Sequence, residues 1–122
     1  MITFRVDNIK NMNACLKPFL EYLKGLGVDE NAVFESRLVS CELISNVIRH
    51  LGETACFEGT LSDDGIVITV SSENTDGSKL CATLPDVFAE SGRGLYIIKA
   101  ICSKISSEGC SVKVCIENKK SE

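Results

Sequence analysis

Residues 55–70 read ACFEGTLSDDGIVITV. They contain two strand-like runs, Ala55–Leu61 and Ile66–Val70, which the polar segment Ser62-Asp63-Asp64-Gly65 connects. An Asp-Gly pair between alternating segments is a strong hairpin signal, because both residues adopt the backbone angles of a tight turn at little cost. We therefore predict an antiparallel β-hairpin near the middle of the chain.

Two helices are predicted ahead of this hairpin. A short alternating strand, Ile2–Val6, comes first, and Asp7 or Asn8 can cap the helix that follows it. Pro18 lies within the helical pattern and indicates either a kink or a later helix start. The helix is identified by apolar residues spaced three and four apart, and they are Met12, Cys15, Leu16, Phe19, Leu20 and Leu23. The segment Gly25-Leu26-Gly27 ends it, and a second helix is expected from about Glu30 to Leu51.

The part of the chain after the hairpin is predicted to be a long connection, a helix and a strand. Residues 71–91 lack periodicity and contain Gly77 and Pro85, which is typical of a functional loop. A helix is expected over Gly94–Ile105 and a last strand over Cys110–Glu117. The order β-α-α-β-β-loop-α-β predicts an α+β fold, a two-layer sandwich in which three helices cover a mixed, mostly antiparallel sheet. We expect residues 1–122 to form a single domain.

Composition excludes several classes of function. The 122 residues are 44% hydrophobic and 25% charged, with a net charge of −4 and no cluster of basic residues, so we expect no nucleic-acid binding. No run of about 18 apolar residues occurs and the start lacks an apolar leader, so a cytoplasmic protein that does not enter membranes is expected. Seven cysteines, an odd number without a C-x-x-C spacing, and a single histidine favour reduced core thiols over disulfides or zinc.

The second helix carries the first candidate site. At about 100° per residue, Glu42, Asn46 and Arg49 fall on one side of the helix, and His50 lies on the flank of that side. The apolar residues on the other side are Cys41, Leu43, Ile44, Val47, Ile48 and Leu51. Glu42 and Asn46 are four residues apart, so their side chains can converge on one ligand. The alternative is a polar face that is only solvated.

A second candidate site precedes the third helix. Residues 91–98 read SGRGLYII, with Gly92, Arg93 and Gly94 just before an apolar helical run. Glycines let the backbone approach a ligand closely, and the amides at a helix N-terminus attract phosphate. The alternative is an ordinary glycine turn at a helix start.

Taken together in this order, the two segments resemble a known family. ELISNVIRH (42–50) is similar to the N box of the GHKL superfamily, which includes the ATPase domains of gyrase and histidine kinases. GRGLYII (92–98) is similar to its glycine-rich G2 box. The Glu-x-x-x-Asn-x-x-x-His form followed by Gly-Arg-Gly-Leu most resembles the anti-sigma serine kinases. This resemblance implies a Bergerat-type ATP-binding fold along nearly the whole chain.

The resemblance also implies a serine/threonine kinase that uses ATP and Mg²⁺. Asn46 would be the magnesium ligand and Glu42 the general base that takes a proton from the attacking hydroxyl. Arg49 and His50 would line the nucleotide pocket. The substrate would be a small antagonist protein, and the partner to be sequestered a sigma factor or a similar regulator. Related kinases pair through the sheet edge near the N-terminus, so a homodimer is one expectation, and the sequence leaves the oligomeric state open.

The phosphates would be held by the second segment. Its contributors are the backbone amides from Gly92 to Leu95, including Gly94, and the side chain of Arg93.

One motif of the family is missing. Its G1 box, D-x-G-x-G, should follow the strand that ends near Val70, with an aspartate that binds adenine. The expected aspartate position falls near Ser72 and the first glycine near Asn74. Asp76, followed by Gly77, can supply the aspartate and glycine of the G1 box only if the junction between the strand and the loop is a few residues longer than in the family. The alternative is that Asp76 and Gly77 form an ordinary turn.

The eroded G1 segment keeps a second function open. It favours a non-catalytic interaction module with a degenerate nucleotide pocket, whereas the intact Glu42–Asn46 pair favours the enzyme. A detached histidine-kinase domain fits less well, since such domains usually have Asn at the position of Glu42.

Overall fold

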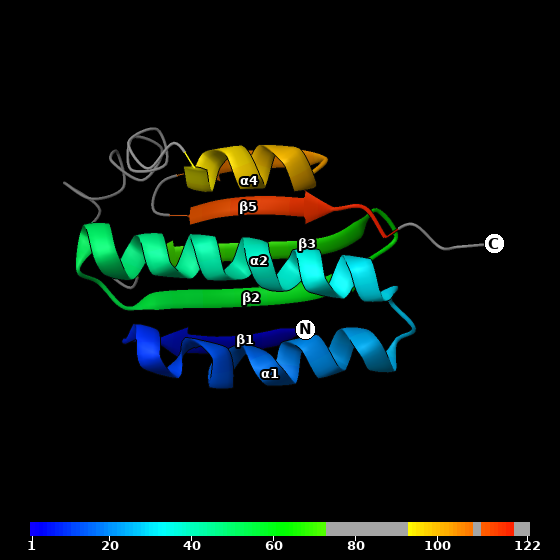
Figure 1. Cartoon of the computed structure of the whole chain (residues 1–122), viewed down its shortest axis with the longest axis horizontal. Helices are drawn as coiled ribbons and strands as arrows, with labels where there is room; N and C mark the ends of the chain where they lie inside the picture. Colours follow the sequence, from blue (N-terminus) through cyan, green and yellow to red (C-terminus); the bar gives the residue numbers. More distant parts are fainter. Residues whose placement is uncertain (73–92, 109–110, 119–122) are drawn as a thin grey trace.

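The computed structural model describes residues 1–72, 93–108 and 111–118; for 50–51, 93–95 and 108 the description covers the backbone only. The elements follow the order of the chain (Figure 1), and they are β1 (Ile2–Val6), α1 (Ile9–Gly25), α2 (Glu30–Asn46), the π-helical turn η1 (Val47–Leu51), β2 (Ala55–Ser62), β3 (Gly65–Ser72), α4 (Arg93–Ile101), β4 (Lys104–Glu108) and β5 (Ser111–Ile116). The predicted first strand, first helix and central hairpin are thereby confirmed.

The strands form one five-stranded sheet in the order β1-β2-β3-β5-β4. Every pairing between its described strands is antiparallel. The expected parallel component of a mixed sheet is therefore not found in this part of the chain. The hairpin is tight, because Ser62 pairs with Gly65 and only Asp63 and Asp64 connect the two strands.

The prediction for residues 94–105 was wrong in its second half. The helix α4 ends at Ile101, and Lys104–Glu108 form an edge strand against β5. The backbone amide of Ser103 donates to the carbonyl of Cys115 at 2.9 Å, so pairing with β5 begins directly after the helix. Ile105 has the spacing of a helical core residue, but it is 41% exposed on this edge.

The first helix begins where the sequence predicted and continues through its proline. The side chain of Asn8 caps it by accepting a hydrogen bond from the amide of Lys10 at 2.7 Å. Pro18 lies inside the helix, which extends to Gly25, so the later start is ruled out. Its buried face consists of Met12, Leu16, Phe19 and Leu23.

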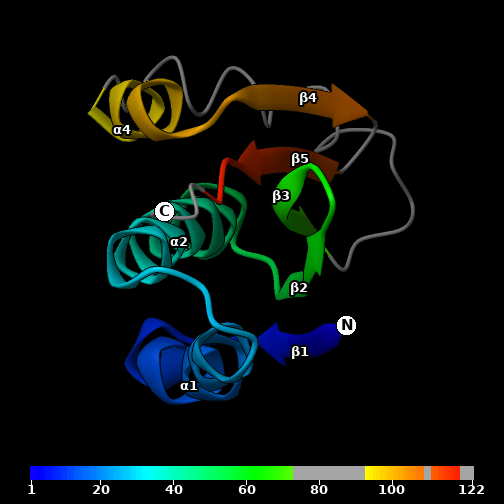
Figure 2. The same ribbon diagram turned by 90° about the vertical axis from the view of Figure 1, so that its right-hand side faces the viewer.

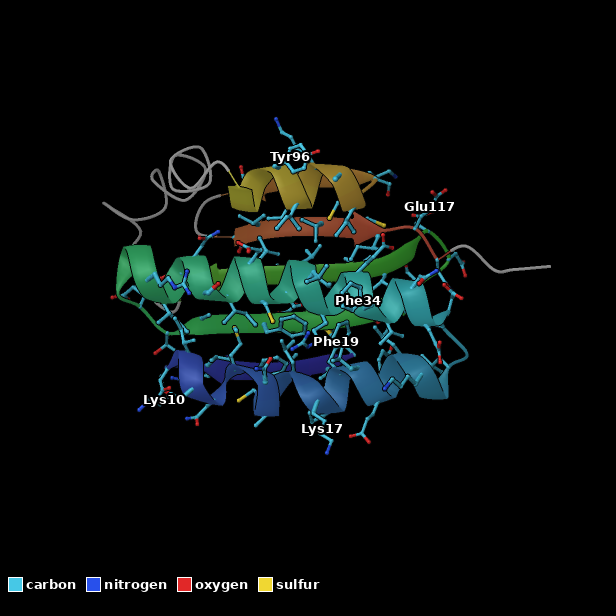
Figure 3. All side chains as sticks on the ribbon, viewed as in Figure 1. Lys10, Lys17, Phe19, Phe34, Tyr96 and Glu117 are labelled. Atoms are coloured by element: carbon cyan, nitrogen blue, oxygen red, sulfur yellow. The ribbon has the colours of Figure 1, made fainter. Side chains whose placement is uncertain are left out.

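The helices cover one face of the sheet (Figure 2), so the fold is α+β with two layers. The core lies between the layers, and every second residue of β2 and β3 contributes to it, including Phe57, Ile66, Ile68 and Val70. Helix α2 is the middle helix and contacts α1 on one side and α4 on the other. Phe34 on α2 and Tyr96 on α4 are exposed on the outside of the helical layer (Figure 3).

None of the helices in the described ranges is long and apolar enough to cross a membrane.

Candidate functional site

The last residue of α2, Asn46, has a buried side chain. It is only 4% exposed, and its Nδ2 atom has no hydrogen-bond partner among the described residues. The five consecutive residues 43–47 are all buried, because α2 is covered by the sheet and by a helix on each side. A buried amide donor without a partner costs about 1–3 kcal/mol. The alternative interpretation, a polar helix face that is only solvated, is therefore wrong at Asn46. Its Nδ2 atom is shielded from solvent and forms no hydrogen bond with the described residues.

Glu42 lies one turn before Asn46 and is half-buried. The serine between them, Ser45, is occupied locally, since its hydroxyl donates to the carbonyl of Cys41. Neither Glu42 nor Asn46 forms a side-chain hydrogen bond with another described residue. The two side chains are thus a carboxylate and an amide at neighbouring positions of one helix, both available to a ligand.

The chain after Asn46 forms a π-helical turn rather than a continuation of the α-helix. The hydrogen bonds of a π turn reach five residues back, so η1 is wider than an α-helical turn, and such turns are frequent at functional sites. The angular positions predicted for Arg49 and His50 assumed a regular helix to Leu51, and they do not apply here. Arg49 is exposed. Gly52, with a φ of 65°, ends the turn in the left-handed conformation.

Three further elements meet the end of α2. Strand β2 begins at Ala55, only a few residues after η1, and Ala55 pairs with Ser72, the last residue of β3. η1 also contacts β3 directly. Helix α4 packs against α2 and begins at the end of the molecule where α2 ends (Figure 1). The structure thus brings Asn46, η1, Ser72 and the first turn of α4 to one end of the fold.

Ser72 lies near the place where the resemblance requires an aspartate. It is 7% exposed and engaged in an interaction of its own. A serine has no charge with which to bind an adenine amino group, so this position does not supply the missing carboxylate. Asp76 lies outside the described residues.

The second motif is placed at the start of α4. Within the described range, Arg93 and Gly94 are the first two residues of this helix and Leu95 is the third. Gly92 lies outside the described residues, as do the side chains of Arg93 and Leu95. The predicted glycine turn includes Gly92, so it stays a prediction.

The described cysteines are free thiols, and they are Cys15, Cys41, Cys56, Cys102 and Cys115. The pKa of Cys102 is raised to about 12, chiefly by burial and to a smaller extent by the charges of Cys115 and Glu35. Burial also raises the pKa of Cys41. Such thiols stay protonated and are poor nucleophiles and metal ligands. Of the five, Cys115 is buried, and three more, Cys15, Cys41 and Cys102, are partly buried against the core. The prediction of core thiols therefore holds for Cys115 and in part for these three.

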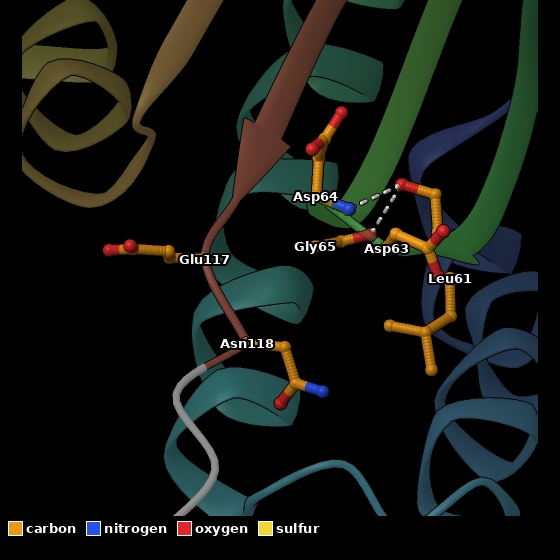
Figure 4. Close-up of a pocket in the computed structure, with 7 residues that line it drawn as sticks. Leu61, Asp63, Asp64, Gly65, Glu117 and Asn118 are labelled. Carbon is orange, nitrogen blue, oxygen red and sulfur yellow. Dashed lines mark hydrogen bonds between the residues drawn. The ribbon is translucent and has the colours of Figure 1, made fainter.

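Two pockets lie away from the end of α2. One, of about 580 Å³, is at the hairpin turn and is lined by Leu61, Ser62, Asp63, Asp64, Gly65, Glu117 and Asn118 (Figure 4). Its serine is used within the turn, since Ser62 Oγ accepts from the amide of Asp64 and donates to the carbonyl of Gly65. The other, of about 440 Å³, borders β4 and β5 and includes Lys104 and Lys113. In the described ranges, no three His, Cys, Asp or Glu side chains are grouped so as to hold a metal ion.

No protein-family model matches the chain. A search of curated proteins also finds no similar sequence.

Proposed function

We propose that this protein binds ATP·Mg²⁺ at the end of α2 and transfers its γ-phosphoryl group to a serine or threonine of a small antagonist protein. The observation that carries the proposal is the buried amide of Asn46, which has no partner within the described structure. Such a group calls for an explanation, and a bound ligand is one. The hydroxyl of Ser40, also buried on α2, is the other side-chain atom without a partner among the described residues, but it lies further from the end of the helix. Residues 42–50 and 92–98 resemble the N and G2 boxes of the GHKL superfamily, and this resemblance suggests that the ligand is a nucleotide.

The residues present fit a magnesium nucleotide. Mg²⁺ prefers oxygen ligands, and rotation about the Cβ–Cγ bond of Asn46 brings its amide oxygen to the position of Nδ2. The bound ion would supply positive charge that offsets the charge of the phosphates. The backbone amides of Arg93 and Gly94, at the described start of α4, would be additional donors for phosphate oxygens. Glu42, half-buried one turn before Asn46, would accept the proton of the attacking hydroxyl.

A second candidate function is a non-catalytic module of the same fold that recognises a regulatory protein. Ser72 favours it, because a buried serine stands where the adenine-binding aspartate is expected. In either case a sigma factor or its antagonist is the class of partner that the resemblance suggests.

The test is calorimetric titration with ATP and ADP, with and without Mg²⁺. We expect Asn46→Ala to weaken ATP·Mg²⁺ binding by more than about tenfold, or about 1.4 kcal/mol, and metal-free binding to change little. Asn31→Ala, at an exposed asparagine in the first turn of the same helix, is the matched control and should bind as the native chain does.

Equal losses with and without the metal would reject the role of Asn46. Absence of nucleotide binding by the native chain would reject the enzyme and leave the interaction module.

A further inference from the structure

Strand β4 is an open edge of the sheet that the described residues form. It is the last strand in the order β1-β2-β3-β5-β4, and residues 104–107 are all exposed. An open edge presents unpaired backbone amides and carbonyls, and natural proteins usually blunt it with charged side chains, proline, a bulge or a very short strand. The charged residues of β4, Lys104 and Glu108, stand at its two ends. β4 contains no proline, and it exposes an apolar residue, Ile105, to 41%. Such an edge is a template for another strand.

The sequence of this edge, Lys-Ile-Ser-Ser-Glu, is complementary in charge to itself. If two copies pair antiparallel about a two-fold axis at Ser106, Lys104 of one copy takes the register position opposite Glu108 of the other, and the symmetry repeats that pair. Opposite charges at paired positions stabilise a sheet, and like charges destabilise it. Lys104 forms no ion pair with the described residues of its own chain, so its charge is available.

We propose that two copies of this chain join through β4 in this register, so that the two five-stranded sheets form one continuous ten-stranded sheet. The contact is isologous and closes on itself, as in most homodimers. It does not rest on the proposed nucleotide site.

Other pairings of the same edge are less favourable. Moving the axis to Ile105 or to Ser107 leaves only three paired residues and separates both lysine–glutamate pairs. A parallel, in-register pair places lysine beside lysine and glutamate beside glutamate. The opposite edge, β1, lacks the complementarity, since an axis at Phe4 sets Arg5 opposite the uncharged Thr3.

A five-residue edge buries less surface than the roughly 1,200 Å² of the smallest stable interfaces, so a weak dimer is expected. Sedimentation of the native chain should show monomer at about 1 µM and a growing dimer fraction toward about 500 µM. Lys104→Glu and Glu108→Lys should each weaken the dimer about tenfold, because each change replaces two attractive pairs with two repulsive ones. The combined variant Lys104→Glu/Glu108→Lys restores opposite charges at the paired positions. Its dimer dissociation constant should return to within about threefold of that of the native chain.

A cysteine at the axis tests the register. Residues directly opposite in an antiparallel pair have Cα atoms about 4.5–5.5 Å apart, within the range of a disulfide. Ser106→Cys should therefore form a covalent dimer under mild oxidation. In Ser107→Cys the Cα atoms of the two cysteines would lie more than about 7 Å apart. This variant should form no more covalent dimer than the native chain does under the same oxidant.

A chain that stays monomeric throughout this range would overturn the proposal. A dimer that neither charge variant weakens, or one that the Ser106→Cys variant does not cross-link, would overturn it too.

Discussion

The ring of Phe19, on α1, packs directly against the backbone of Gly59, on β2. A Cβ added at Gly59 would overlap the Cε1, Cδ1 and Cζ atoms of the ring. Phe19 is fully buried and also meets the ring of Phe57 edge-on, at 5.0 Å between centroids, so it has no free space in which to move. A glycine at position 59 thus sets how closely α1 approaches the sheet.

Gly59→Ala is expected to destabilise the protein by about 1–3 kcal/mol, the usual cost of overpacking a core. Chemical denaturation followed by circular dichroism measures it. Gly25→Ala is the matched control, because no atom lies within 4 Å of a Cβ there, and it should leave stability unchanged or raise it slightly. Equal effects of the two substitutions would contradict the packing argument.

Asn46→Leu should separate stability from binding. It removes a buried donor that has no partner in the described structure, so the free energy of unfolding should be maintained or rise by about 1 kcal/mol. Magnesium-dependent nucleotide binding should be lost. Ser36→Ala on the same helix serves for comparison, because its buried hydroxyl donates to the carbonyl of Ala32 at 2.7 Å and its loss should be destabilising. A loss of more than about 2 kcal/mol in Asn46→Leu would mean that Asn46 is a structural residue.

Glu42→Gln should keep nucleotide affinity and reduce phosphoryl transfer by roughly 10²–10⁴, because the amide cannot accept the proton. Measurement of ATP turnover beside calorimetric affinity separates the two effects. Full activity in the variant, or loss of the fold, would exclude Glu42 as the general base.

The nucleotide base should be recognised weakly. A carboxylate bound to the adenine amino group contributes about 1.5–3 kcal/mol, and Ser72 cannot replace it. We expect binding no tighter than about tens of micromolar, with ATP preferred over GTP by less than about tenfold. Tight, ATP-selective binding that collapses in Asp76→Ala would instead assign adenine recognition to Asp76.

The fold should lose stability at alkaline pH partly through Cys102. Its pKa is raised from 9.0 to about 12 in the folded protein, chiefly by burial. The folded state therefore holds this proton more tightly than the unfolded state, so the contribution is complete below about pH 9 and decreases as the pH rises toward 12. The substitution Cys102→Ala removes this one titrating group. Denaturation midpoints should therefore fall less steeply between pH 8 and 11 in the variant than in the native chain. An unchanged slope would contradict this role.

The sequence predicted those elements whose local signals agree with their tertiary surroundings. The polar segment at 62–65 and the spacing of Met12, Leu16, Phe19 and Leu23 have one structural interpretation each, and both the hairpin and the helix are found. The turn residues are Asp63 and Asp64, one position earlier than the Asp-Gly pair, because Gly65 already pairs with Ser62. Strand β4 was missed because Cys102 and Ile105 continue the period of α4. Pairing with β5 decides the conformation of Ile105, and a neighbouring strand is not visible in local periodicity.

The candidate site could be predicted only as a set of residues on one helix. Burial of Asn46 depends on α1, α4 and the sheet closing around the end of α2, which a helical wheel for a single helix cannot express. The π turn at residues 47–51 has no clear sequence signal, and it changes the direction of Arg49. The nucleotide itself stays a prediction.

The position of β5 inside the sheet determines when this protein can finish folding during synthesis. The hairpin of β2 and β3 can form as soon as residue 72 has left the ribosome. The second edge of β3 stays unpaired until β5, residues 111–116, has been synthesised. Until then the row of Ile66, Ile68 and Val70 has an open edge, and the nascent chain carries an unpaired apolar strand that invites aggregation. A chain interrupted anywhere before Ser111 would keep that edge, and we expect cells to need chaperones for it.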